Sequence, residues 1–383
     1  MTSTTYESPW MNEEARIFRR TVRRFIEKEL APHQSRWAEQ GRLDREAWIA
    51  AGRAGLLLPD VPDEYGGGSG SFAHEAVVVE ELARAGLHLG FGIQSIVAHY
   101  LLAYGSEEQK HRWLPGMARG DLVGAIGMTE PDSGSDLTAI RTTARREADQ
   151  YVVNGAKTFI TNGGYADLVC LAVRTDLTKP GPRALSLLML ETKDLPGYRV
   201  GRSLPKIGRP AQDTCELFFE DVRVPAGNLL GVGEGRGLFQ MMDQLRYERL
   251  SIALSAVSVS ERAIEITARH VKERKAHGKP LLELQNTRFT LAESKTEAHI
   301  GRIFVDHCIQ EFIAGRLDTV SASMAKYWLT ECECRIVDAC VQLHGGYGYT
   351  REYPIGPMWV DSRAQRIYAG SNEVLKDLIG WSI

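Results

Sequence analysis

Hydroxyl groups and glycines are concentrated in residues 127–136, GMTEPDSGSD. The hydroxyls of Thr129, Ser133 and Ser135, together with nearby backbone N–H groups, could hold a phosphate or the polar edge of a ring without any cation. On its own, such a composition is more typical of a polar turn. The segment stands where helical patterns give way to runs rich in Val, Phe, Leu and Thr.

A second candidate is residues 158–164, TFITNGG. Phe159 comes two residues before Thr161, so in a regular strand both side chains would point to the same face. A ring and a hydroxyl on one face could stack on a planar cofactor and hydrogen-bond to it. A core phenylalanine beside a turn threonine is the simpler explanation of this pair alone.

Two further stretches lie in the C-terminal part of the chain. Residues 271–285, VKERKAHGKPLLELQ, are basic at the end of a long helical pattern, where cations are favourable without any ligand. Residues 342–354, QLHGGYGYTREYP, run into 366–373, RIYAGSNE. Gly345, Gly346 and Gly348 would let this backbone approach a ligand closely.

Helical patterns occupy both ends of the chain. An apolar stripe from residue 12 to Leu30 predicts a helix with Asn12 as its N-cap and Pro32 as its stop. Beyond residue 237 the predicted helices are far longer than the usual mean of about 12 residues, which indicates a bundle. The other helices expected are 44–55, 72–86, 92–105, 238–277, 288–315, 318–343 and a short one after Ser371.

Between the helical parts, short apolar runs separated by Gly, Pro and Asp predict an antiparallel sandwich or barrel of about 110 residues. Asn154-Gly155 is expected to form a hairpin turn. The alternating glycines of 231–237, GVGEGRG, do not match GxGxxG and are expected to form a flexible domain junction. The expected strands lie within 151–161, 166–175, 184–191 and 215–224.

The fold class that these patterns predict is α+β, mostly α, with domains at 1–123, 124–237 and 238–383. The chain has 383 residues, 43% hydrophobic and 25% charged, with a formal net charge of -3, which is typical of a soluble globular protein. Nothing indicates nucleic acid binding. Neither a signal peptide nor an apolar run of roughly 18 residues is evident, so a cytoplasmic protein is expected.

The sequence contains six cysteines, and Cys332 and Cys334 form the closest pair. Their CxC spacing differs from the CxxC of common metal sites, and a helix would point them about 200° apart. Buried or half-buried free thiols are therefore expected, and no metal.

Five segments occur in an order that resembles the acyl-CoA dehydrogenase family over essentially the whole chain. They are MTEPDSGSD, FITNG, ERKAHGK, QLHGGYGYTREYP and IYAGSNE. The resemblance implies an N-terminal helical domain, a middle antiparallel β domain and a C-terminal four-helix bundle. It also implies FAD held between the domains and between subunits of a homotetramer.

Carried over motif by motif, the resemblance assigns the cofactor contacts. Phe159 and Thr161 would lie against the isoalloxazine ring near N5. His277 would contact the adenine, at a position where the family's ERK motif usually continues with Phe. The remaining FAD contacts implied are Met128, Thr129, Ser135, Arg274, Gln285, Gln342, Gly346, Ser371 and Glu373.

The position of the catalytic base is the main departure from the family. Many members read Tyr-Glu-Gly-Thr where this chain has Ala369, and an alanine side chain cannot accept a proton. The family role of the Ala369 N–H, to hydrogen-bond the thioester carbonyl with a flavin ribityl hydroxyl, would remain.

Glu248, in QLRYERL, is the expected substitute for the missing base. It shares a helix face with Leu245 and Ile252, and partial burial makes a carboxylate a better proton acceptor. An isolated helical Glu is more often a surface residue. The long-chain and isovaleryl-type branches of the family, however, carry their catalytic Glu on this helix as Glu-Arg-Leu.

The resulting hypothesis is an FAD-dependent acyl-CoA dehydrogenase of fatty acid β-oxidation that forms a trans-2-enoyl-CoA and passes electrons to electron-transfer flavoprotein. Two alternatives are an acyl-CoA oxidase and a non-catalytic subunit of a heteromer. Gly90 and Gly92 could leave room for a long or branched acyl chain, or serve a tight turn. The expected substrate contacts are Gly92, Ile96, Arg249, Tyr368 and Gly370.

Overall fold

The computed structural model describes residues 6–178 and 181–383, which form two compact units. One unit combines the described residues up to Ile26 with Phe72–Leu87 and Arg246–Ile383. The other consists of Glu27–Ser71 and His88–Leu245. Each unit is therefore built from segments that are far apart in the sequence.

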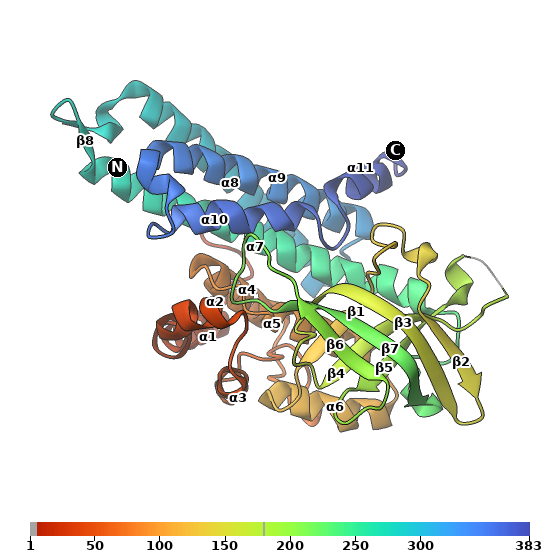
Figure 1. Cartoon of the computed structure of the whole chain (residues 1–383). Helices are drawn as coiled ribbons and strands as arrows, with labels where there is room; N and C mark the ends of the chain where they lie inside the picture. Colours follow the sequence, from red (N-terminus) through yellow and green to blue (C-terminus); the bar gives the residue numbers. More distant parts are fainter. Residues whose placement is uncertain (1–5, 179–180) are drawn as a thin grey trace. The chain divides into compact units, whose positions relative to one another are not determined.

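The first unit is helical. Apolar side chains of α7, α8, α9 and α10 meet in one core, which includes Val259, Ala298, Ile336 and Met358, and these helices lie alongside one another (Figure 1). Its helices are α1 (Glu13–Phe25), α4 (Phe72–Arg84), α7 (Gly237–Glu273, whose first turns belong to the other unit), α8 (Gln285–Ile313), α9 (Thr319–His344), α10 (Ile355–Ser362) and α11 (Asn372–Gly380).

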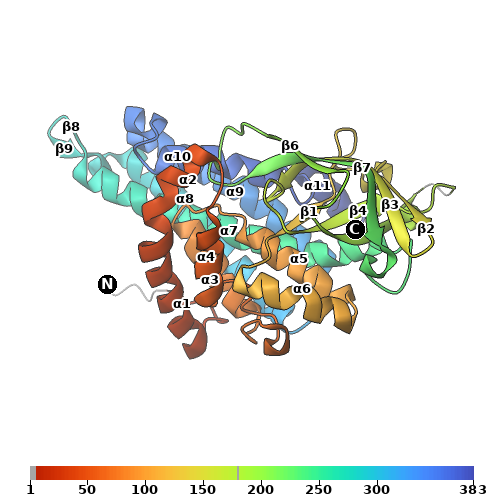
Figure 2. The same ribbon diagram turned by 60° about the horizontal axis from the view of Figure 1, so that its bottom comes forward.

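The second unit is a seven-stranded sheet with helices on one face (Figure 2). The strand order is β1-β4-β2-β3-β7-β6, and β5 pairs with β4. Most neighbours are antiparallel, but β4 pairs in parallel with both β1 and β2. Its elements are α2 (Gln34–Gln40), α3 (Arg45–Arg53), α5 (Phe91–Tyr104), α6 (Glu107–Arg119), β1 (Gly124–Gly127), β2 (Thr143–Glu147), β3 (Gln150–Thr161), β4 (Leu168–Arg174), β5 (Leu185–Glu191), β6 (Tyr198–Ser203) and β7 (Thr214–Pro225).

Both faces of β4 are buried. Leu168, Cys170 and Ala172 pack with α5 and α6, whereas Val169 and Leu171 pack with the inward side chains of β3 and β7. A strand that is covered on both faces has a continuous apolar run instead of an alternating one. This explains why LVCLAVR is apolar at six successive positions.

The predicted Asn154-Gly155 hairpin is wrong. Both residues lie inside β3, and the register with β7 shifts between Val153 and Gly155, as in a β-bulge. Gly155 is required there, because a Cβ would lie 2.5 Å from Oγ1 of Thr142. The Asn154 side chain bonds to Asp221 of β7, so this dipeptide serves the bulge and not a turn.

Several helix boundaries also differ from the prediction. Asn12 does cap α1, accepting a hydrogen bond from the Ala15 N–H, but Pro32 lies in a 3-10 turn after which α2 continues. The helix α7 ends at Glu273 because a two-stranded turn with Gly278 at φ +81° follows. The helices α6 and α10 were not predicted.

In the glycine-rich junction 231–237, Gly235 and Gly237 pack closely against Ser186, whereas Val232 is fully exposed. The N–H of Gly235 donates to Oγ of Ser186, and a Cβ on Gly237 would lie 2.7 Å from the Ser186 backbone. These glycines therefore allow close backbone packing.

The six cysteines form no disulfide, and five of them are buried, with Cys334 half-buried, as predicted. In the described part of the chain, no helix is long and apolar enough to cross a membrane. Residues 6–178 and 181–383 also contain no group of His, Cys, Asp and Glu side chains suited to a metal ion.

Candidate active site

Glu248 lies in the first third of α7 and is 8% exposed, so the burial predicted for it is confirmed. Its neighbour Arg249 is also buried, at 3% exposure. Burial lowers the pKa of the Arg249 guanidinium, and the nearby Glu248 carboxylate opposes this shift. A carboxylate and a cation are thus buried side by side on one helix.

Arg249 connects this helix to the turn at 368–370. Its Nε donates to the carbonyl oxygen of Ala369 at 3.4 Å, and its Nη1 donates to Oγ of Ser323 at 3.0 Å. Tyr368 is 37% exposed beside them. The structure therefore brings Arg249, Tyr368, Ala369 and Gly370 together, with Glu248 adjacent in the chain.

The turn itself has an unusual backbone. Ala369 has φ +53° and Gly370 has φ +89°. The left-handed region costs a residue with a Cβ roughly 1–2 kcal/mol, so surrounding contacts must hold Ala369 there. No hydrogen bond from the Ala369 N–H is found within the described residues.

Ser371 follows the turn and caps α11 by accepting from the Val374 N–H at 3.4 Å. The backbone N–H of residue 373 and the Ser371 hydroxyl lower the pKa of the exposed Glu373 carboxyl. Both candidate cofactor residues thus lie at a helix N-terminus, where N–H groups are directed outward and favour an anion.

The other candidate cofactor residues of this unit lie at the far end of α9. Arg274 is exposed, with its guanidinium 5.7 Å from the Tyr347 ring centroid, so it lies beside the Gly345–Tyr349 turn. His277 is exposed with φ +52°. Gln285, Gln342 and Gly346 are exposed as well.

These two groups of residues are widely separated. Lys326, which touches the 370–372 segment, and Gln342 are sixteen positions apart on α9, or about 24 Å at 1.5 Å per residue. Within this unit the structure therefore does not bring Ser371 and Glu373 close to Arg274, Gln342 and Gly346.

In the second unit, a buried ion pair anchors the loop that contains Met128 and Thr129. Lys157 donates to the Met128 carbonyl at 3.0 Å and to Glu130 at 2.8 Å, and both side chains are nearly inaccessible. Glu130 also accepts the N–H groups of Arg141 and Thr142. Sequence reasoning did not identify Lys157 or Glu130.

The charges of this pair follow from their surroundings. Burial disfavours the Glu130 carboxylate, but Lys157 and the N–H donors outweigh burial, and the pKa of Glu130 lies below its usual value. Burial lowers the pKa of Lys157 to about 8, against the attraction of Glu130. Met128 and Thr129 are left half-buried, and Ser135 is exposed.

Phe159 does not follow the strand alternation on which its prediction rested. It has φ +58° and lies in a second bulge of β3, between Lys157 and Ile160. Its ring is 66% exposed, whereas Thr161 is half-buried and pairs regularly with Thr214. The bulge interrupts the regular strand geometry at Phe159 and exposes its large apolar ring.

Asn162 is a further residue that sequence reasoning missed. It is fully buried, and its Nδ2 donates to the carbonyls of Gly90 and Gly124. A Cβ on Gly90 would lie 2.2 Å from Oδ1 of Asn162, so Gly90 serves this tight junction. Gly92, by contrast, is exposed with no atom within 4 Å of a Cβ, and Ile96 is half-buried.

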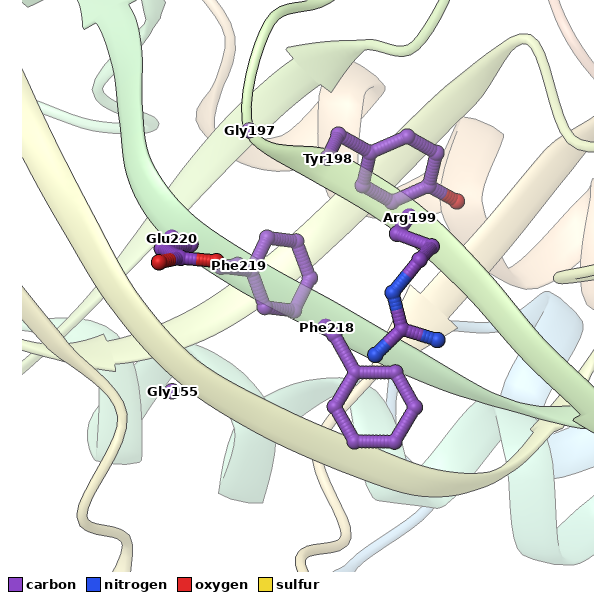
Figure 3. A pocket seen from close by; sticks show the side chains of 7 residues that line it. All are labelled: Gly155, Gly197, Tyr198, Arg199, Phe218, Phe219 and Glu220. Atoms are coloured by element: carbon purple, nitrogen blue, oxygen red, sulfur yellow. The ribbon is translucent and has the colours of Figure 1, made fainter.

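A hollow of about 460 Å³ lies elsewhere, between β6 and the bulge at Gly155 (Figure 3). The Arg199 guanidinium lies 4.2 Å from the Phe218 ring centroid in this hollow. None of the candidate site residues lines it.

Comparison with known proteins identifies the class. The sequence patterns of the N-terminal, middle and C-terminal domains of acyl-CoA dehydrogenase match residues 12–121, 125–222 and 235–383. The chain belongs to the acyl-CoA dehydrogenase family, and several of its relatives are named as acyl-CoA dehydrogenases.

Individual relatives agree with this class and with the predicted long-chain branch. A mitochondrial long-chain specific acyl-CoA dehydrogenase of Sus scrofa is 45% identical over 96% of this chain and 86% of that protein. The crystal structure of an acyl-CoA dehydrogenase from Geobacillus kaustophilus has a TM-score of 0.96 at 45% identity, covering 98% of this chain and 99% of that one. A glutaryl-CoA dehydrogenase from Mycobacterium smegmatis, solved in complex with FADH2, has a TM-score of 0.90 at 29% identity, covering 97% and 95%.

Proposed function

We propose that this chain is an FAD-dependent acyl-CoA dehydrogenase in which Glu248 is the base that removes the α-proton. The observation that carries the proposal is the burial of Glu248 next to Arg249, which hydrogen-bonds to the backbone of Ala369. Ala369 occupies the position where many family members have their glutamate. The chain thus has a buried glutamate on α7 that is next in sequence to the arginine in contact with this turn.

Two groups of the chain would act on the substrate. The Glu248 carboxylate accepts the proton from the α-carbon of the acyl thioester. The N–H of Ala369 donates to the thioester carbonyl and stabilises the negative charge that develops on its oxygen, a contribution of roughly 10²- to 10³-fold per donor. Arg249 and Tyr368 shape the surroundings of the turn, and Gly370 completes it.

The candidate cofactor residues offer the aromatic ring, hydroxyl groups and N–H donors that a flavin cofactor can bind. Phe159 presents an exposed ring from a rigid bulge, and the hydroxyls of Thr129, Thr161 and Ser135 are suited to polar edges and phosphate. Ser371 and Glu373 lie at the N-terminus of α11, and Arg274 lies beside the glycines of the 345–349 turn. When bound, FAD would supply the two-electron acceptor that takes the β-hydrogen as hydride.

The separation of the cofactor residues along α9 supports a site completed by another subunit. Arg274, His277, Gln285, Gln342 and Gly346 lie too far from Ser371 to contact the same end of one cofactor. A homotetramer in which neighbouring subunits share the FAD site is therefore proposed. Electron-transfer flavoprotein is proposed as the electron acceptor and the cytoplasm as the location.

For the acyl chain, the open surface at Gly92 and the half-buried Ile96 support a long or branched substrate. Identity with a long-chain specific relative favours the same choice. An acyl-CoA oxidase and a non-catalytic subunit of a heteromer remain as alternatives, and both are separated from the dehydrogenase by the experiment below.

The test uses the purified holoenzyme and a panel of straight and branched acyl-CoAs. The protein should be yellow, and a good substrate should bleach the flavin. Reoxidation should be slow in air and fast with electron-transfer flavoprotein or a ferrocenium acceptor. Rapid formation of stoichiometric peroxide would indicate an oxidase, and a protein that binds no FAD on reconstitution would contradict the proposal.

A further inference from the structure

Lys326, on α9, is a fully buried lysine whose amine contacts the segment after Ala369. Its Nζ donates to the Gly370 carbonyl at 2.8 Å and to Oδ1 of Asn372 at 3.1 Å. Nothing in the activity proposed above requires a lysine there. A buried amine normally carries a large desolvation cost, so the two contacts call for an explanation.

Asn372 is itself held in place by α9. Its Nδ2 donates to Oγ1 of Thr330 and to Oε1 of Glu331, both at 3.0 Å. Lys326 thus joins a rigid helix to two points of the chain, one on each side of Ser371. The segment from residue 370 to 372 cannot move relative to α9 without breaking these bonds.

The turn that Lys326 holds has the strained backbone described above, with positive φ at Ala369 and Gly370. Two successive carbonyls of this turn face cations: the Ala369 carbonyl faces Arg249, and the Gly370 carbonyl faces Lys326. The Lys326 bond is the shorter of the two, at 2.8 Å against 3.4 Å. Fixing the two carbonyls fixes the peptide planes on either side of Gly370. The Ala369 N–H lies one residue earlier, so its direction then depends only on φ and ψ of Ala369, whose φ is +53°.

We propose that Lys326 is a positioning residue of the dehydrogenation site, which holds the Ala369–Gly370 turn so that the Ala369 N–H points at the thioester carbonyl. The proposal rests on the function proposed for Ala369. Lys326 does not touch the substrate, and it acts only through the backbone that it holds.

The protonation of Lys326 is compatible with this role. Burial and the nearby charge of Arg249 lower its pKa to about 7, although the charges of Glu373 and Glu331 oppose the shift. A neutral amine has two N–H donors, and the amine has two acceptors, the Gly370 carbonyl and Asn372. Both hydrogen bonds therefore persist whether or not the third proton is present.

The test replaces Lys326 by methionine, which has a similar length and no donor. Lys295, an exposed lysine on α8, gives the matched control Lys295→Met. With FAD content equal, Lys326→Met should reduce its flavin roughly 10²- to 10³-fold more slowly, the effect of one lost donor to the carbonyl, with KM changed only a few-fold. Lys295→Met should behave as the wild type.

A spectroscopic measurement separates positioning from general damage. The infrared stretch of a ¹³C-labelled thioester carbonyl in bound enoyl-CoA should shift to lower frequency in the wild type, because the N–H polarises it. Lys326→Met should lose most of this shift, and a shift and a rate that both stay at wild-type values would overturn the proposal. If the methionine variant does not fold, Lys326→Gln, whose side chain is too short to reach both acceptors, is measured in the same way.

The outcome also distinguishes this proposal from the one on which it rests. An inactive Glu248→Gln with an unaffected Lys326→Met would remove only the positioning role. An active Glu248→Gln would remove the proposed site itself, whatever Lys326→Met does.

Discussion

The Nε of Arg249 lies 3.4 Å from the carbonyl oxygen of Ala369, 120 positions further along the chain. This contact joins the helix that carries Glu248 to the turn where a base is missing. Arg249 of α7 thus holds the turn at Ala369, and Glu248 of the same helix is the carboxylate proposed to serve this turn, which has none of its own.

Glu248→Gln should abolish flavin reduction while FAD and acyl-CoA still bind. The amide keeps the shape of the side chain but cannot accept the α-proton, so the rate should fall by at least the roughly 10²- to 10⁴-fold of general base catalysis. Stopped-flow bleaching of the flavin measures this rate. Glu265→Gln, on an exposed position of the same helix, is the control and should retain the wild-type rate.

Ala369→Glu in the Glu248→Gln background should recover part of the lost rate. The two positions are proposed to approach the same α-carbon from different segments, so a carboxylate at either one should serve. Recovery is expected to be incomplete because a longer side chain must be accommodated at φ +53°. Near wild-type reduction by Glu248→Gln alone would show that the base lies elsewhere.

Phe159→Ala should weaken FAD binding about two- to tenfold without destabilising the apoprotein. The ring is 66% exposed, so its removal creates no cavity, while a stacking contact contributes about 0.5–1.5 kcal/mol. Titration of apoprotein with FAD and thermal unfolding of apoprotein give the two quantities. Phe159→Tyr keeps the ring and should bind FAD as the wild type does, and equal affinity in all three proteins would exclude stacking on Phe159.

Much of the fold could be predicted because it depends on local patterns. The long apolar periods predicted α7, α8 and α9 with boundaries within a few residues of those observed. Asn12 was predicted as the N-cap of α1, and a short helix was predicted after Ser371. The family resemblance gave the three-part architecture, and the pattern of α7 placed Glu248 on an apolar face.

The errors arose where long-range contacts override local preference. Asn154-Gly155 favours a turn in isolation. In the fold it forms a bulge of β3, because Thr142 packs closely against Gly155 and Asp221 bonds to Asn154. The alternation of β3 fails at Phe159 for a similar reason. Lys157 and Lys326 were missed because a lysine in a sequence indicates the surface, and only the fold supplies the carbonyls and carboxylates that bury them.

Lys157→Met should destabilise the protein by about 3–5 kcal/mol, because it leaves the buried Glu130 without its cation. The double variant Lys157→Met/Glu130→Gln should be less destabilised, since no charge is left unpaired. Urea unfolding at neutral pH measures both. A double variant that is less stable than Lys157→Met would contradict this account.

The Lys157–Glu130 pair should also make the free energy of unfolding depend on pH in the acid range. The pKa of Glu130 is lowered in the folded state from an ordinary value of 4.5. The ionised Glu130 carboxylate therefore contributes its full share to the free energy of unfolding above pH 4.5, and this share is lost as the pH falls through the folded pKa. The Glu130→Gln variant should lose less stability than the wild type over this acid range.

The buried Lys326 should make the free energy of unfolding depend on pH in the neutral to alkaline range. Its pKa is about 7 in the fold, against 10.5 ordinarily, so between these values the unfolded chain binds a proton that the folded protein does not. Raising the pH through this window therefore favours the folded state, because the amine releases a proton on folding and this release costs less free energy as the pH rises. Lys326→Met has no such group, so the free energy of unfolding of the wild type should increase relative to that of the variant between pH 7 and about pH 9. Urea unfolding of both proteins at the two pH values gives the difference directly, and all groups that they share cancel from it. A difference that stays constant, or that shrinks as the pH rises, would show that Lys326 is charged throughout and that the amine is stabilised by its neighbours more strongly than burial opposes it.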